Sequence, residues 1–141
     1  MSAEILIVDS DRENRESLED VLSEEEYRVH SAAAGQEALA VLKEKEIDLI
    51  ILELKLPDMS GAEVMRQLDL SHPQTQVVIL TEERSFESAV DAVRSGAVDY
   101  LLKPYKREEL LSSVGRAFLD KAERDQKWML YRQVESSYEL I

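Results

Sequence analysis

The chain of 141 residues contains no cysteine, only four glycines and only three prolines. Without cysteine it has neither disulfide bonds nor thiolate metal sites, which fits a cytoplasmic protein. No apolar run approaches the roughly 18 residues of a membrane-spanning helix. The N-terminus lacks the basic segment and apolar stretch of a secretory signal, and no glycine-rich phosphate loop is present. We therefore expect a cytoplasmic protein that does not interact with membranes.

Positive charge is also scarce, because 17 Lys and Arg stand against 30 Asp and Glu. The formal net charge of −13 disfavours contact with nucleic acid or anionic lipid. The imbalance is uneven: residues 103–141 carry 8 basic and 7 acidic side chains, so residues 1–102 hold the whole acidic excess. The sequence predicts no nucleic-acid binding by this segment.

Short apolar runs alternate with amphipathic stretches along the chain, which is long enough for one domain with a sizeable core. The apolar runs predict strands at residues 5–8, 27–32, 48–54, 76–81 and 98–102. The amphipathic stretches predict helices at residues 12–24, 36–44, 61–70 and 85–95, and from about residue 106 onward. Five strand–helix units in succession imply a doubly wound α/β domain, with a parallel sheet covered by helices on both faces.

Polar residues stand where the predicted strands end: Asp9 and Ser10, Glu53, Thr81, and Lys103. In a parallel sheet these ends meet at one edge, where open α/β folds place their chemistry. Carboxylates suit Mg²⁺, while a lysine and a hydroxyl bind phosphate oxygens. The pattern predicts a site for a divalent cation and a phosphoryl group. A set of solvated acids with one ordinary salt bridge is the alternative.

Five blocks of sequence together resemble the receiver domains of two-component response regulators. They are residues 5–9, 48–61, 77–81, 92–104 and 108–110. Their order and separations fit the family over roughly residues 3–121. The resemblance implies a flavodoxin-like receiver fold with strand order 2-1-3-4-5. It also implies a receiver domain at residues 1–121, followed by an extension of the last helix at residues 122–141.

The resemblance assigns the phosphoacceptor and metal positions residue by residue. Glu53 falls on the phosphoacceptor, which is nearly always aspartate in the family. Asp9 falls on the first acid of the metal-binding pair, and Ser10 replaces the second. Lys55 falls on the position that offers a backbone carbonyl to the metal. The metal set would therefore be Asp9, Glu53 and Lys55, with one acid missing.

The positions that respond to phosphorylation are all retained. Thr81 matches the switch hydroxyl, Tyr100 the switch aromatic residue, and Lys103 the phosphate-binding lysine. Pro104 matches a proline whose peptide bond is usually cis in the family. The resemblance therefore implies a complete response apparatus beside an altered acceptor.

The two departures concern the chemistry of phosphoryl transfer. Ser10 removes a negative ligand, so we expect Mg²⁺ binding to be weakened or absent. Glu53 moves the carboxylate outward by about 1.5 Å, in a kind of site where a misplacement near 1 Å can cost ~100-fold. We expect a divergent receiver, not an enzyme, that acts by protein–protein contact without efficient phosphorylation. Its partner would be a sensor histidine kinase or an output domain.

Several alternatives stay open at this point. Glu53 either mimics a phosphorylated acceptor or pairs with Lys103 in one fixed state. Another interpretation is a conventional Mg²⁺-dependent receiver that phosphorylates and dephosphorylates itself and regulates a transcription factor or an enzyme output domain. An engineered Asp-to-Glu phosphomimic of such a receiver is a further one, although Ser10 counts against it.

The last helix has no predicted end, because residues 106–141 contain no proline and no glycine after Gly115. A heptad stripe runs along it, with apolar residues Leu110, Val114, Ala117, Trp128, Tyr131 and Tyr138 and charged interruptions Lys121, Arg124 and Glu135. Aromatic residues on an extension favour an interface. We expect homodimerisation or docking through this helix, and a helical linker to an output domain is the alternative.

Overall fold

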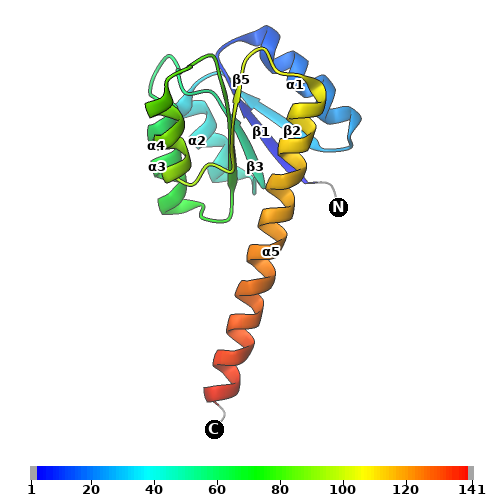
Figure 1. Ribbon diagram of the computed structural model, residues 1–141, viewed down its shortest axis with the longest axis vertical. Helices are drawn as coiled ribbons and strands as arrows, with labels where there is room; N and C mark the ends of the chain where they lie inside the picture. The colour runs from blue at the N-terminus through cyan, green and yellow to red at the C-terminus, as the bar shows by residue number, and fades with distance from the viewer. Residues whose placement is uncertain (1–2, 140–141) are drawn as a thin grey trace.

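A five-stranded parallel sheet lies between two layers of helices in the computed structural model, which describes residues 3–139 (Figure 1). The elements are β1 (Glu4–Val8), α1 (Arg12–Glu24), β2 (Arg28–Ala32), α2 (Gly35–Glu44), β3 (Leu49–Leu52), α3 (Gly61–Ser71), β4 (Gln76–Thr81), α4 (Phe86–Arg94), β5 (Asp99–Leu102) and α5 (Arg107–Glu139). The strands are hydrogen-bonded in the order β2-β1-β3-β4-β5. This confirms the expected doubly wound fold and its strand order.

Each face of the sheet has its own apolar core. Alternate strand residues such as Leu6, Ile50 and Ile79 pack against α2, α3 and α4. Their neighbours on the opposite face, such as Ile7 and Ile51, pack against α1 and α5. The central strands β3 and β4 are buried along their whole length, as expected for parallel strands covered on both faces.

The third strand ends earlier than the sequence predicts. It covers Leu49–Leu52, so Glu53 is the first residue beyond it instead of lying within a strand at residues 48–54. The amide of Glu53 still donates to the Val8 carbonyl at 2.9 Å. Its side chain then accepts a bond from the next amide, and the chain leaves the sheet. The acid therefore stands at the start of a loop.

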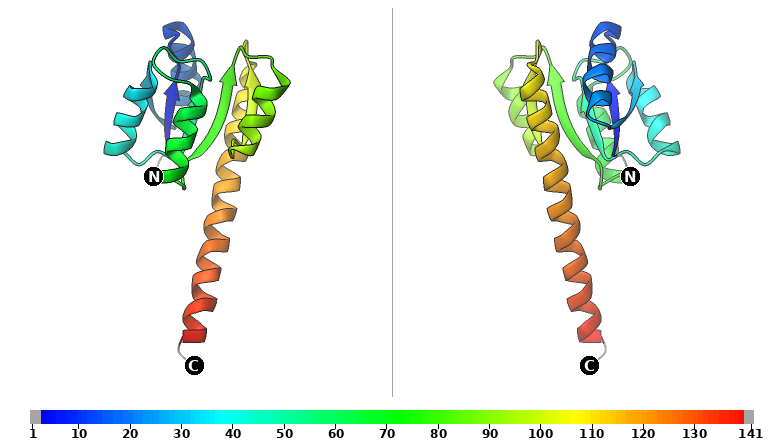
Figure 2. Two further views of the ribbon diagram at one scale, coloured as in Figure 1. Left: turned by 90° about the vertical axis from the view of Figure 1, so that its left-hand side faces the viewer. Right: turned by 90° about the vertical axis from the view of Figure 1, so that its right-hand side faces the viewer.

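The last helix continues well past the sheet. Its first part packs on the sheet through Leu110, Val114 and Ala117, which are fully buried. Its second part projects beyond the amino ends of the strands (Figures 1 and 2). The extended C-terminal helix is confirmed, while the domain boundary after residue 121 stays a prediction. Within residues 3–139, no helix has the length and apolarity needed to cross a bilayer.

Two leucines of α3 allow a matched test of the packing. Leu68 is 2% exposed in the core, and Leu70 on the same helix is 76% exposed. Leu68→Ala should lower the free energy of unfolding by about 2–5 kcal/mol, because it leaves a cavity. Leu70→Ala should change it by less than about 0.5 kcal/mol. Urea unfolding measures both, and equal losses would contradict this packing.

Candidate functional site

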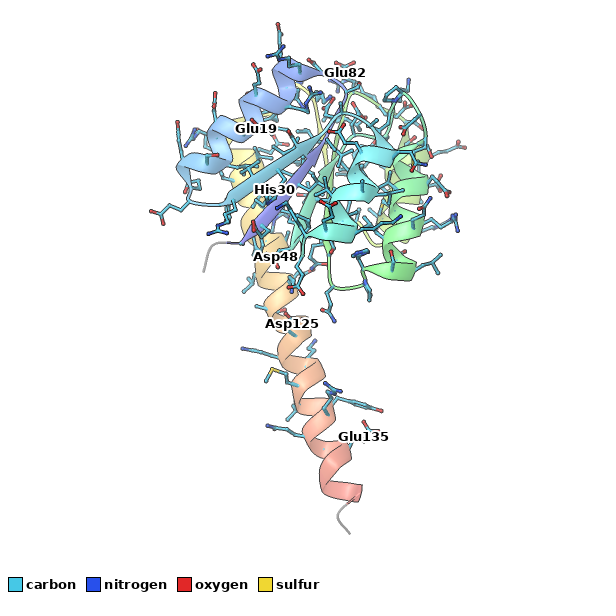
Figure 3. The ribbon with its side chains drawn as sticks, turned by 180° about the vertical axis from the view of Figure 1, so that it is seen from behind. Glu19, His30, Asp48, Glu82, Asp125 and Glu135 are labelled. Carbon is cyan, nitrogen blue, oxygen red and sulfur yellow. The ribbon has the colours of Figure 1, made fainter. Side chains whose placement is uncertain are left out.

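The carboxyl edge of the sheet collects the residues Asp9 after β1, Glu53 after β3, Thr81 at the end of β4 and Lys103 after β5. Figure 3 marks this end of the domain by Glu82, which follows β4. Asp48, which precedes β3, lies at the other end of the sheet, and Asp125 and Glu135 on α5 lie farther in the same direction. The candidate site and the projecting helix are therefore at opposite ends of the domain.

Lys103 joins two buried carboxylates. Its Nζ atom lies 2.6 Å from Asp9 Oδ2 and 3.0 Å from Glu53 Oε1. The three side chains are only 12%, 5% and 9% exposed, respectively. Burial alone lowers the pKa of Lys103, but hydrogen bonds and charges of Asp9 and then Glu53 outweigh it and hold this pKa above its ordinary value. Lys103 is therefore a firmly charged bridge at neutral pH.

The backbone of Lys103 is also fixed. Its peptide bond to Pro104 is cis, as the resemblance implied. Its amide donates to the Thr81 carbonyl at 2.8 Å, and its carbonyl accepts a bond from the Arg84 guanidinium at 3.2 Å. The backbone of Lys103 is thus tied both to the end of β4 and to the loop that follows it.

The second carboxylate oxygen of Glu53 is held by the backbone. Oε2 accepts a bond from the Leu54 amide at 2.6 Å and a longer one from the Lys55 amide at 3.4 Å. Gly61 allows the chain to fold back here, because a Cβ atom at this position would lie 2.6 Å from the Glu53 carbonyl oxygen. The loop after β3 therefore supplies backbone N–H donors to the Glu53 carboxylate.

A second contact steadies the loop that carries these donors. The Asp58 carboxylate accepts bonds from the Gly35 and Gln36 amides at 2.8 and 2.9 Å, and so caps the first turn of α2. The Gln36 and Gly35 amides lower the pKa of Asp58. Lys55 and Ser60 pair across the same loop. The loop after Glu53 is therefore anchored to a neighbouring helix.

Two residues at this site were missed by the sequence reasoning. The Asn14 side-chain amide donates to Asp9 Oδ2 at 2.7 Å, and the Arg15 guanidinium donates to the Asp9 carbonyl at 2.8 Å. The Asp11 amide adds a bond to Asp9 Oδ1 at 2.9 Å. The sequence feature that could have revealed Asn14 and Arg15 is their position in the first turns of α1, the helix that directly follows Asp9. Asp9 is therefore fully engaged by this chain's own groups.

Thr81 and Tyr100, the predicted switch residues, both contact Glu83. Thr81 is buried, and its hydroxyl oxygen accepts a bond from the Glu83 amide at 3.2 Å. The Tyr100 ring packs against the core, and its hydroxyl donates to the Glu83 carbonyl at 2.7 Å. Burial, and then the charges of Glu83 and Glu53, raise the pKa of Tyr100. Tyr100 is therefore turned inward.

The mouth of the site is partly closed by an ion pair. Lys55 Nζ lies 3.4 Å from Glu83 Oε2, with the lysine side chain 82% exposed. Beside this pair, a cavity of about 360 Å³ opens next to Glu53, Thr81 and Arg84. The sequence placed Lys55 here for its carbonyl, whereas the structure adds a side-chain contact across the opening.

The donor set does not fit a receiver's Mg²⁺ site well. Receiver domains generally bind Mg²⁺, a hard cation that needs several oxygen ligands. Ser10 is exposed and uncharged, and both Asp9 and Glu53 are bonded to Lys103. Among the described side chains, no three His, Cys, Asp or Glu residues are grouped as metal ligands. We therefore derive no step through a metal ion.

Solved structures of receivers share this architecture. The receiver domain protein from Methanospirillum hungatei JF-1 superimposes with a TM-score of 0.84 at 29% identity, over 88% of this chain and 99% of that one. The receiver domain of a putative Luxo repressor protein from Vibrio parahaemolyticus gives 0.85 at 28% identity, over 89% and 97%. The fold is therefore that of known receiver domains.

The sequence comparisons agree. The cell cycle response regulator CtrA of Brucella ovis is 36% identical over 110 residues, which are 78% of this chain and 47% of CtrA. The chain thus spans about half the length of the curated relatives it matches. The family model of the response regulator receiver domain matches residues 5–115. The chain belongs to the response regulator receiver domains of two-component signal transduction.

Proposed function

We propose that this chain is a divergent receiver that signals by protein–protein contact without efficient phosphorylation, because Glu53 itself supplies negative charge at the acceptor position. The observation that carries the proposal is the setting of the Glu53 carboxylate. It is bound by Lys103 at 3.0 Å and by the Leu54 amide at 2.6 Å. Phosphoryl oxygens are stabilised by the same kinds of group, a cation and backbone N–H donors.

The same bonds make Glu53 a poor phosphoacceptor. Attack on a phosphodonor needs a carboxylate oxygen aligned with the leaving group, and catalysis depends on positioning and charge neutralisation. Here Oε1 is held by an ammonium and Oε2 by the backbone. Ser10 also leaves the cation site one acid short. Receiver domains are signalling modules, so the proposed output is a change of contact surface.

The orientation of Tyr100 supports mimicry of the phosphorylated state over a fixed inactive pairing. An inward Tyr100, bonded to the Glu83 carbonyl, is the arrangement we associate with an engaged switch. Within residues 3–139, no hydrogen bond joins Thr81 directly to Glu53. The proposed link therefore runs from Glu53 through Lys103, whose amide is bonded to the Thr81 carbonyl.

The proposed contact surface covers α4, β5 and the start of α5, including Tyr100 and Lys106. On this surface Phe86 and Val93 are 83% and 62% exposed. Exposed large apolar residues of this kind mark interaction sites. The partner that we propose is a sensor histidine kinase or an output domain.

The second candidate function is a conventional Mg²⁺-dependent phosphoaccepting receiver. The observation that favours it is the cavity of about 360 Å³ beside Glu53, which offers a small phosphodonor a route to the carboxylate. An engineered Asp-to-Glu phosphomimic of such a receiver accounts for Glu53 but not for Ser10.

We also propose homodimerisation through the projecting part of α5. Tyr131 of the predicted heptad stripe is 60% exposed there, and the neighbouring Leu130 and Met129 are 61% and 63% exposed. Isolated helices are marginally stable in water, and most helical stability comes from packing an apolar face. A second copy of the helix would cover these residues. A helical linker toward an output domain remains the alternative.

Phosphorylation is tested by incubation with acetyl phosphate and Mg²⁺, followed by intact-mass measurement. We expect the unaltered chain to gain no phosphoryl group, because both Glu53 oxygens are engaged and the cation site lacks an acid. The variant Glu53→Asp with Ser10→Asp should gain one phosphoryl group at residue 53, and it serves as the positive control. A Mg²⁺-dependent adduct on Glu53 itself would favour the conventional receiver.

Replacing Lys103 tests the buried bridge. Lys103→Met should lower the free energy of unfolding by about 3–5 kcal/mol, since it leaves two buried carboxylates without a cation. The pKa of Lys103 is higher in the folded protein than its ordinary value of 10.5. The Lys103 ion pairs therefore contribute fully to the free energy of unfolding below pH 10.5, and this contribution is lost as pH rises through the folded pKa. The difference in the free energy of unfolding between the unaltered protein and Lys103→Met should stay constant between about pH 7 and 9 and should decrease at higher pH.

Lys106→Met is the matched control for this experiment, because Lys106 is exposed and lies three residues away. It should change stability by less than about 0.5 kcal/mol. A difference between unaltered protein and Lys103→Met that already shrinks between neutral pH and pH ~9 would contradict a raised lysine pKa.

The dimer is tested by sedimentation equilibrium. Tyr131→Glu should weaken self-association at least about tenfold, because it places a charge in the heptad stripe, where Tyr131 is 60% exposed. Gln126→Glu adds the same charge on an exposed position of the same helix and should have a smaller effect. A protein that stays monomeric at high concentration, with or without residues 122–141, excludes the proposed dimer.

A further inference from the structure

A second cavity lies between α3 and α4, and it shares Lys55 and Glu83 with the opening beside Glu53. It has a volume of about 250 Å³. Its lining includes the largely buried side chains of Met65 and Ala92, and the exposed Ala62 and Asp91 stand on its two helical sides. We call it the α3–α4 groove. The ion pair between Lys55 and Glu83 also belongs to its lining.

The size and the lining of the groove suit one apolar side chain. Small-molecule sites in proteins usually enclose about 300–1,000 Å³, so this groove is below the range expected for a cofactor. A short segment of a protein, anchored by one buried side chain, fits such a volume. Leu54, Met65 and Ala92 provide the apolar surface that such an anchor needs.

The polar part of the lining favours a cation next to that anchor. Asp91 and Glu83 contribute two carboxylates, against the single ammonium of Lys55. Asp91 lies in the last turn of α4, whose terminal carbonyls also attract positive charge. The acidic excess of the chain lies in residues 1–102, which include the groove. Charge complementarity therefore selects a basic partner segment.

We propose that the α3–α4 groove docks a segment of a partner protein that inserts a Leu-sized apolar side chain and places an adjacent arginine against Asp91 and Glu83. In the Lys55–Glu83 pair the lysine side chain is 82% exposed and the glutamate side chain is 28% exposed. The exposed ammonium is the weakly held partner, so an incoming guanidinium can displace Lys55. A guanidinium binds carboxylates with two parallel bonds, which a lysine does not.

A partner docked at Glu83 would contact the residue that is hydrogen-bonded to both Thr81 and Tyr100. The backbone of Glu83 is bonded to the Thr81 hydroxyl through its amide and to the Tyr100 hydroxyl through its carbonyl. A partner that binds the Glu83 side chain can therefore shift the positions of Thr81 and Tyr100. The groove is lined partly by α4, so this docking site adjoins the contact surface on α4, β5 and α5. It does not depend on Glu53 acting as a phosphate mimic.

The test is to titrate peptides into the full chain and to monitor its backbone amide chemical shifts by NMR. The probes are two blocked dipeptides, acetyl-Leu-Arg-amide and acetyl-Leu-Glu-amide. We expect saturable shifts at Ala62, Glu83 and Asp91 with the arginine peptide, in the millimolar range. The glutamate peptide should bind at least about fivefold more weakly, because like charges repel at the groove. Absence of saturable shifts at these residues overturns the proposal.

Two pairs of variants test whether the arginine peptide binds in the groove. Ala62→Trp should fill the cavity and abolish the shifts, whereas Ala40→Trp on the exposed face of α2 should leave them unchanged. Asp91→Asn should weaken the arginine peptide about threefold to tenfold, and Asp69→Asn on α3 should not. If Ala62→Trp fails to fold, the Asp91 and Asp69 pair decides alone.

The same spectra identify the occupant. Shifts at the groove that grow with protein concentration when no peptide is present would show that a second copy of the chain fills it. That outcome overturns the partner-segment proposal. Equal binding of the arginine peptide to Ala62→Trp and to Ala40→Trp also overturns it. Neither result bears on phosphorylation, which the acetyl phosphate experiment tests by itself.

Discussion

One ammonium group determines the arrangement of the carboxyl edge. Lys103 Nζ stands between Asp9 Oδ2 and Glu53 Oε1, and all three side chains are largely buried. Two buried carboxylates without a cation would disfavour each other's charge, and an unpaired buried charge costs several kcal/mol. The ends of β1, β3 and β5 are therefore held by one side chain. The Lys103 backbone extends the same network to the end of β4 and to Arg84.

The extra length of Glu53 is accommodated within this network. The third strand stops at Leu52, and the glutamate side chain folds onto the Leu54 amide while it keeps its ion pair. The close approach at Gly61 and the cap that Asp58 forms on α2 keep those amides in place. The longer side chain thus finds partners for both of its carboxylate oxygens. This is why we interpret Glu53 as a fixed charge and not as a damaged acceptor.

Much of this could be predicted from the sequence. The alternation of apolar and amphipathic stretches predicts the five strands, the five helices and their order. It does so because the faces that each element buries determine the spacing of its apolar residues. Strand ends then gather Asp9, Glu53, Thr81 and Lys103 on one edge. The contacts of Asn14 and Arg15 with Asp9 were not foreseen, since they depend on side-chain direction across elements. The early end of β3 was missed because a local hydrogen bond outweighs the apolar run.

A fixed charge at the acceptor position changes what can regulate such a domain. A ligand shifts a conformational equilibrium only by its differential affinity for the two states. If phosphate no longer provides that difference, a partner must bind where the two states differ. Glu83 is the place we propose, because it holds Thr81 and Tyr100 through its backbone while its side chain lines the α3–α4 groove beside Lys55. The proposed partner segment in the groove would therefore act on Thr81 and Tyr100 without chemistry at Glu53.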